Sequence, residues 1–108
     1  MADARLTRIE QQIEKIKKEL LLIGEMRPGS LTKQYRQPKE KKGGFYQISY
    51  TYKMKSKTEY VRPQHFDDLK QQVETYQKFK DLIEKWIDLA LEHSKLKIQF
   101  DKRKQENE

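Results

Sequence analysis

Basic residues are concentrated in the middle of the chain, at a density that could bind the phosphate groups of a nucleic acid. Residues 25–62 contain ten Lys and Arg against three Asp and Glu, a net charge of +7, whereas residues 1–24 carry +1 and residues 63–108 carry −1. Lys and Arg supply much of nucleic-acid affinity by neutralising phosphates. The cations expected to do so are Arg27, Lys33, Arg36, Lys39, Lys41, Lys42, Lys53, Lys55, Lys57 and Arg62. Solvation of the chain accounts for the same charges equally well.

Polar side chains that could contact base edges alternate with tyrosines in the same segment. Gln47, Ser49 and Thr51 lie between tyrosines and Ile48. A two-stranded ribbon fits the major groove of DNA, where Gln pairs with adenine and Ser or Thr with several bases. The tyrosines could instead stack on single-stranded bases. We favour the alternative that the tyrosines form the core of a small sheet.

Residues for catalysis or metal binding are scarce. The chain has no cysteine, and its two histidines, His65 and His93, are far apart in sequence. A Gly-rich phosphate loop and a Gly-x-Ser-x-Gly motif are both missing. The acidic residues of the second half lie among lysines, as on a solvated helix. We therefore expect no enzyme, no metal or other cofactor and no small-molecule substrate.

Two helices are predicted to flank the basic segment. Leu6, Ile9, Ile13, Ile16, Leu20 and Ile23 follow the 3–4 spacing of a heptad repeat, which predicts a helix over 3–24 with Asp3 as N-cap and Gly24 as its stop. Pro63 and the acidic pair Asp67 and Asp68 indicate the start of a longer helix over 63–100. The polar tail 101–108 is expected to be disordered.

Between the helices we predict a basic loop over 25–44 and a two-stranded β-hairpin over 45–62. Pro28, Gly29, Pro38, Gly43 and Gly44 punctuate the loop, and period-two alternation of Tyr, Ile and Thr indicates the hairpin. Its turn is placed at residues 53–56 as a four-residue or bulged connection, because no Asn-Gly pair is present. The tyrosine face is expected to include Thr58, and the opposite face Lys57 and Glu59.

The predicted fold class is mainly α with a β-hairpin. Two antiparallel helices, the second much longer, are joined by the basic loop and the hairpin in a single domain over residues 1–100. The apolar band of the long helix is too wide for the short helix to cover, so we expect a homodimer. Its interface would contain Phe79, Leu82, Ile83, Trp86, Ile87, Leu89 and Ala90.

Four segments together resemble a family of short prokaryotic proteins of unknown function. These are Arg27–Leu31 (Arg-Pro-Gly-Ser-Leu), Gly44–Thr51, Lys55–Val61 and Tyr76–Ile87, within about residues 26–96. Members of that family are often found near transposases or other mobile elements, which favours a role with nucleic acid. Many carry cysteines after the Pro-Gly-Ser loop, at a spacing that suggests a metal knuckle. This chain has none there. The hairpin is also similar to the small sheets with which tyrosine recombinases bind arm-type DNA sites, by fold analogy only.

The expected function is therefore that of a small non-enzymatic protein that binds nucleic acid, most simply DNA, or assists a mobile element. The main alternative is a coiled-coil module that binds another protein and uses its charge for solubility. An inhibitor of a nucleic-acid enzyme is a more distant third possibility. The longest apolar run, Leu20–Ile23, is too short to cross a bilayer, so a cytoplasmic protein without membrane contact is expected.

Overall fold

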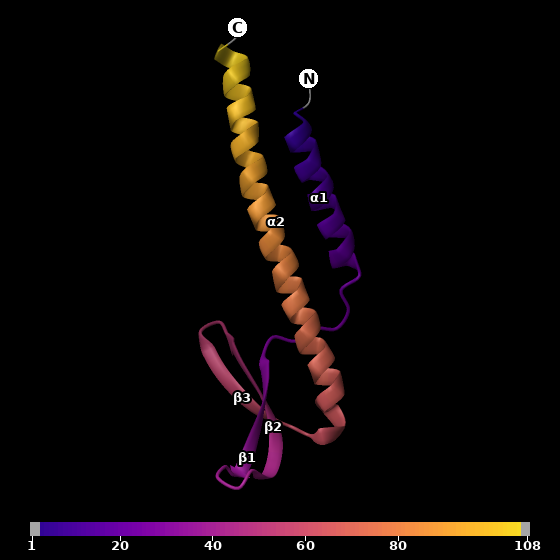
Figure 1. Ribbon diagram of the computed structural model, residues 1–108, viewed down its shortest axis with the longest axis vertical. Coiled ribbons are helices and arrows are strands. Elements are labelled where there is room, and N and C mark those ends of the chain that lie inside the picture. Colours follow the sequence, from indigo (N-terminus) through magenta and orange to yellow (C-terminus); the bar gives the residue numbers. More distant parts are fainter. Residues whose placement is uncertain (1–2, 107–108) are drawn as a thin grey trace. The chain divides into compact units, whose positions relative to one another are not determined.

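The computed structural model describes residues 3–106, and the side chains of residues 3–103 (Figure 1). The chain divides into two compact units. One consists of residues Gly24–Lys78 and contains a β-sheet, and the other combines residues Met1–Ile23 with Phe79–Glu108 and is helical. The helix α2 (Phe66–Glu106) contributes to both units. It continues beyond the predicted end at residue 100, and residues 107–108 of the predicted tail lie outside the described residues.

The sheet has three antiparallel strands in the order β1-β2-β3, so the predicted two-stranded hairpin between the helices is wrong. Its strands are β1 (Ser30–Gln37), β2 (Lys42–Tyr52) and β3 (Lys55–Val61). β2 is the central strand and pairs with β1 from Ser30 opposite Ser49 to Gln37 opposite Lys42. The correct fold description is a helix, a three-stranded meander and a long helix.

The segment predicted as a basic loop contains β1 because its side chains alternate. Leu31 and Tyr35 are partly buried, whereas Thr32 and Gln34 between them are exposed. The prolines and glycines around this stretch suggested a loop, but they mark the ends of the strand. A third strand also supplies the pairing that an isolated hairpin lacks in water.

One face of the sheet packs against the first turns of α2. Ile48, at the centre of β2, is fully buried, and Val61 at the end of β3 is buried beside it. The ring of Tyr46 lies 4.1 Å from that of Phe66, the first residue of α2. The register pairs Ile48 with Glu59 and Ser49 with Thr58. The predicted grouping in β3 is therefore reversed, because Glu59 shares the tyrosine face and Thr58 the opposite one.

The turn between β2 and β3 is tighter than predicted. Tyr52 pairs directly with Lys55, so only Lys53 and Met54 connect the strands. Both have positive φ angles, 50° and 66°, as a type I′ turn requires. Asn and Gly usually occupy these positions because other residues are strained there. Because the sequence has no Asn-Gly pair at this point, it predicts a longer connection.

Replacing Met54 by glycine is expected to stabilise the sheet. Met54 is almost fully exposed, so its side chain contributes little packing, while its positive φ costs about 1 kcal/mol relative to glycine. Met54→Gly should therefore raise the melting temperature measured by circular dichroism. Lys57→Gly, in the extended part of β3, is the control and should lower it, because glycine weakens a strand. A lower melting temperature for Met54→Gly would show that the positive φ of Met54 does not destabilise the sheet.

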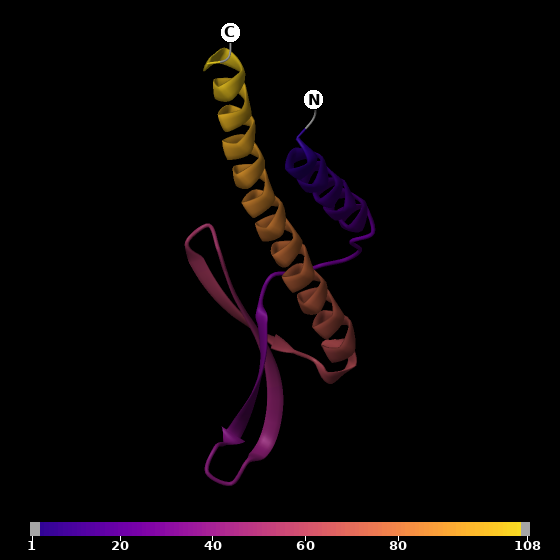
Figure 2. The ribbon, with the colours of Figure 1, turned by 45° about the horizontal axis from the view of Figure 1, so that its top comes forward.

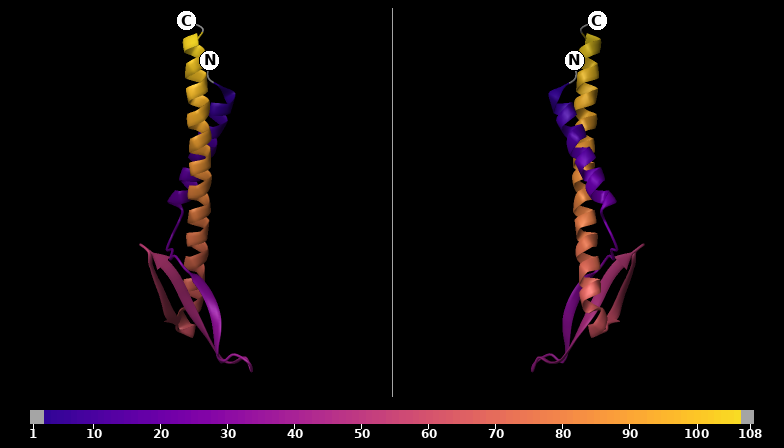
Figure 3. Two further views of the ribbon diagram at one scale, coloured as in Figure 1. Left: turned by 90° about the vertical axis from the view of Figure 1, so that its left-hand side faces the viewer. Right: turned by 90° about the vertical axis from the view of Figure 1, so that its right-hand side faces the viewer.

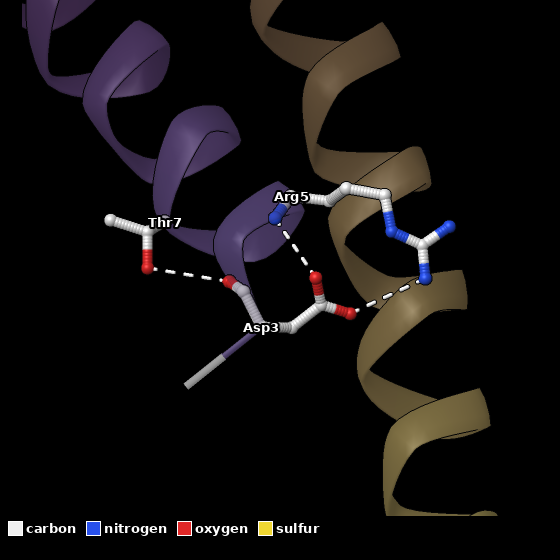
Figure 4. Close-up of polar contacts among 3 residues, drawn as sticks. All are labelled: Asp3, Arg5 and Thr7. Carbon is white, nitrogen blue, oxygen red and sulfur yellow. Dashed lines mark hydrogen bonds and ion pairs between the residues drawn. The ribbon is translucent and has the colours of Figure 1, made fainter. Parts of the chain in front are cut away.

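The helical unit pairs α1 (Ala4–Leu21) with residues 79–106 of α2 in antiparallel orientation (Figure 3). Asp3 caps α1, since its carboxylate accepts the backbone N–H of Arg5 at 2.9 Å (Figure 4). This contact and the Arg5 guanidinium hold the pKa of Asp3 below its usual value of 3.8. Thr7 donates its hydroxyl to the backbone carbonyl of Asp3.

Two contacts fix the register of the helix pair. His93 Nε2 lies 3.0 Å from Glu10 Oε1, and the Lys17 ammonium lies over the Trp86 ring at 5.6 Å. This register places the heptad residues of α1 opposite residues of α2 at matching 3–4 spacing. On α2 the matching row is Phe79, Leu82, Trp86, Leu89, His93 and Leu96, and Leu82 and Leu89 line one hollow with Ile16 of α1. Ile9, Ile16 and Leu82 are the buried core of this unit.

The residues predicted as a dimer interface divide into two groups on α2. Phe79, Leu82, Trp86 and Leu89 belong to the row that faces α1. Ile83 lies off that row and is half-buried, and Ile87 and Ala90 are exposed. Over the described residues, neither helix contains an apolar stretch that would cross a lipid bilayer.

Candidate nucleic-acid interface

The outward face of the sheet, away from α2, is covered mainly by uncharged polar side chains. Strand alternation and the register of both strand pairs define its members. We call this surface the polar face; it consists of Ser30, Thr32, Gln34, Arg36, Phe45, Gln47, Ser49, Thr51, Ser56, Thr58 and Tyr60. None of these side chains is a carboxylate, and most are exposed. The predicted base-contacting residues of β2 therefore lie together on a surface open to a ligand.

Hydroxyl groups on the polar face are held in place by contacts between neighbouring strands. Ser49 Oγ lies 3.0 Å from Thr58 Oγ1, and Thr51 Oγ1 lies 2.8 Å from Ser56 Oγ. Each hydroxyl has one donor and two acceptor positions, so one such bond leaves capacity for another partner. The paired hydroxyls thus form an ordered row that can still donate to and accept from a ligand.

An aromatic pair lies at one side of this row. The rings of Phe45 on β2 and Tyr60 on β3 are tilted, with centroids 6.3 Å apart. Tyr60 is more than half exposed. An exposed ring of this kind can pack against a thymine methyl group, a sugar or an unstacked base.

Cations lie at both ends of the sheet. The β1–β2 turn and the first residue of β2 provide Lys39, Lys41 and Lys42, and the β2–β3 turn provides Lys53. These two turns are at opposite ends of the strands (Figure 2). Arg36, near the end of β1, and Arg62, directly after β3, are also exposed. Glu40 is the one acidic residue in these turns, and its carboxylate lies 3.8 Å from the Lys42 ammonium.

Four of the predicted cations do not point to the polar face. Lys33, Lys55 and Lys57 occupy strand positions on the face that packs against α2, and Arg27 lies on the same side. Lys33 lies over the rings of Tyr35 and Tyr46, at 5.5 and 5.8 Å. The predicted set of basic residues is therefore split between two faces of the sheet.

Arg27 has a structural role. Its guanidinium donates to the carboxylate of Glu59 and lies over the Tyr50 ring, and its backbone N–H donates to the carbonyl of Gln72 on α2. The hydrogen bond from Arg27 lowers the pKa of Glu59 below its usual value of 4.5. Because this pKa is depressed, the stabilisation is present above pH 4.5 and is lost as the pH falls through the lower folded value.

The tyrosines of β2 lie mainly where the preferred interpretation placed them, in the packing of the sheet. Tyr46 stacks on Phe66, and Tyr50 lies under Arg27 and donates to Glu59 at 3.4 Å. Tyr52 is exposed beside the Lys53 ammonium. Tyr60 is the other exposed tyrosine of the sheet, and it lies on the polar face.

Sequence reasoning missed the contributions of β1 and β3 to the polar face. Ser30, Thr32 and Gln34 were assigned to a loop, and Thr58 was placed on the wrong face. The signal in β1 was the alternation of Leu31, Lys33 and Tyr35 with small polar residues. The sequence of β3 does not indicate which of its side chains share a face with those of β2. This depends on the length of the β2–β3 turn, because a shift of one residue exchanges the two faces of a strand.

Histidines and carboxylates are the remaining side chains that could bind a metal ion. No group of three or more His, Asp or Glu lies close enough to hold a metal ion in the part of the chain that the structure describes. His65 ends the 3₁₀ turn Pro63–His65 before α2, and His93 contacts Glu10. Comparison with protein-family models, with curated proteins and with solved structures finds no match for this chain.

Proposed function

We propose that this protein is a non-enzymatic DNA-binding protein that uses the polar face of its sheet. The observation that supports this is the composition of that face, where ordered hydroxyl and amide groups occur without a carboxylate, between three lysines at the β1–β2 turn and Lys53 at the β2–β3 turn. A protein that only needs charge for solubility has no reason to exclude acidic residues from one face. Polyanions would be attracted to it without local repulsion.

The dimensions of the sheet suit a duplex. Neighbouring strands lie about 4.8 Å apart, so the two outer strands are about 10 Å apart, while the major groove of B-DNA is about 12 Å wide. In this proposal the sheet faces the groove, Gln47 and the hydroxyl row meet base edges, and the lysines of the turns reach phosphates on either side. Lys33, Lys55, Lys57 and Arg27 do not take part.

The proposal can be tested by fluorescence anisotropy with labelled duplex DNA at about 50 and 200 mM salt. Lys39→Ala/Lys42→Ala should weaken binding on the order of tenfold per lysine at ~0.1 M salt, and should reduce the salt slope by about one per lysine. Lys15→Ala/Lys18→Ala on α1 removes the same charge from the helical unit and should change the affinity for DNA little. Absence of binding at about 50 mM salt, or equal losses in both variants, would overturn the proposal.

A second variant separates base contacts from phosphate contacts. Duplexes enriched by the wild-type protein from a random pool provide a preferred sequence, and a scrambled duplex provides the reference. Gln47→Ala should reduce the preference between them by about tenfold while leaving the affinity for the scrambled duplex nearly unchanged. If Gln47→Ala leaves the preference for the selected duplex unchanged, Gln47 does not contact base edges, and the sheet binds phosphates only.

The cellular setting is part of the same proposal. We place the protein in the cytoplasm, where DNA is accessible in a prokaryote. The resemblance to proteins encoded near transposases supports a role as an accessory protein of a mobile element.

A further inference from the structure

Residues 79–106 of α2 carry two apolar rows, and only one of them faces α1. The second row, which we call the outer row, consists of Ile83, Ile87, Leu91 and Ile98, at spacings of 4, 4 and 7. These spacings place the four side chains along one side of a helix. Ile87, Leu91 and Ile98 are 54%, 56% and 64% exposed. Exposure of consecutive large apolar side chains on one side of a helix is typical of an interface.

The two ends of the outer row are symmetric about its middle. Ile83 and Ile98 lie at its two ends, and the midpoint between them falls at Ala90 and Leu91. A second copy of α2 in antiparallel orientation would place Ile83 of one copy opposite Ile98 of the other. Leu91 would then lie opposite Ala90 of the other copy, close to the two-fold axis, and Ile87 opposite Ser94. The matching ends and centre give the kind of self-complementarity that a symmetric dimer interface requires.

Charges beside the outer row select the same orientation. Glu84, Asp88, Lys95 and Lys102 follow spacings of 4, 7 and 7, which places them in one line along the helix. The two carboxylates precede the midpoint and the two ammonium groups follow it. Antiparallel pairing brings Lys95 of one copy between the levels of Glu84 and Asp88 of the other. Parallel pairing would leave the two lines on opposite sides of the interface, without this pairing of opposite charges.

We propose that a second copy of this chain docks antiparallel on the outer row. The proposal is independent of DNA binding, because the outer row belongs to the helical unit and the polar face to the sheet unit. It also revises the predicted interface: Phe79, Leu82, Trp86 and Leu89 serve the α1–α2 pair, whereas Ile83, Ile87 and Ala90 serve the dimer together with Leu91 and Ile98.

Light scattering coupled to size exclusion tests the dimer on the full chain. The wild type should show twice the 13.1 kDa chain mass at micromolar concentration. Ile87→Glu/Leu91→Glu should weaken dimerisation on the order of a hundredfold or more, because each glutamate would be buried without a partner. Leu22→Glu on α1 is the control, since Leu22 is 85% exposed and lies outside the row. A monomer at every concentration, or equal loss in the control, would overturn the proposal.

Orientation is tested with single cysteines, because the chain has none of its own. Leu91→Cys should form a disulfide-linked dimer on oxidation, whereas Ile98→Cys alone should not, because its counterpart would be far away. A mixture of Ile83→Cys and Ile98→Cys should cross-link. Glu84→Lys/Asp88→Lys should weaken the dimer about tenfold, and adding Lys95→Glu/Lys102→Glu should restore it. Efficient cross-linking of Ile98→Cys by itself would show a parallel pair and overturn the assignment.

Discussion

Ile48→Ala is expected to remove a large part of the stability of the sheet unit. Ile48 is the one fully buried large side chain among the described residues. Truncation of a buried isoleucine costs about 2–5 kcal/mol, through lost burial and the cavity that remains. Small domains have total stabilities of about 5–15 kcal/mol, and a unit with so small a core lies at the lower end. Urea denaturation followed by tyrosine fluorescence and NMR spectra would measure the loss.

Two further substitutions provide reference values for the stability loss of Ile48→Ala. Ile48→Val keeps most of the side-chain volume and should cost about 0.5–1.5 kcal/mol. Leu22→Ala removes an exposed side chain of the helical unit and should change stability by less than about 0.5 kcal/mol. If Ile48→Ala costs no more than Leu22→Ala, the packing of the sheet against α2 is not what stabilises this unit.

The second large effect is expected for Gly29→Ala. Gly29 has a φ of 145°, a conformation that L-residues rarely adopt. A Cβ atom at this position would also lie 2.8 Å from Cγ1 of Ile48 and 3.2 Å from the carbonyl oxygen of Ser49. Backbone strain costs about 1–3 kcal/mol, and forced repacking about the same again. The sum approaches the cost of Ile48→Ala, although the substitution adds only one methyl group.

A double-mutant cycle separates the two causes. An Ile48→Val background removes Cδ1 of Ile48, which a Cβ atom at Gly29 would meet at 3.0 Å, but leaves Cγ1 and the backbone conformation unchanged. Gly29→Ala should therefore cost less there than in the wild type, and the difference measures the contact with Cδ1. Gly24→Ala is the matched control, because a Cβ atom at residue 24 would meet nothing within 4 Å. Equal losses for Gly24→Ala and Gly29→Ala would contradict the contact with Ile48.

The helices could be predicted from sequence because their signals are local. The heptad spacing of α1, the cap Asp3 and the acidic first turn of α2 all depend on neighbours within a few residues. The second apolar row of α2 was visible too, as a band wider than one helix can cover. Its division into a row for α1 and an outer row required the register, which only contacts such as His93 with Glu10 provide.

The sheet was harder to predict because its determinants are long-range. β1 pairs with a strand beyond a lysine-rich turn, and the charge of that turn concealed the alternation around Leu31 and Tyr35. The residues Lys53 and Met54 gave no sign that they form a tight turn. These two errors account for the misassigned parts of the candidate interface: the sequence predicts a loop where β1 carries its polar residues, and it predicts Thr58 on the opposite face.

The open edges of the sheet bear on how the protein behaves at high concentration. β1 and β3 each leave one row of backbone donors and acceptors without a strand partner in the meander. Such edges tend to pair with other chains and polymerise, and basic side chains on them oppose this. Lys33 and Arg36 on β1 and Lys55 and Lys57 on β3 provide this protection. The lysines that face away from the proposed DNA surface therefore oppose the pairing of edge strands between separate molecules.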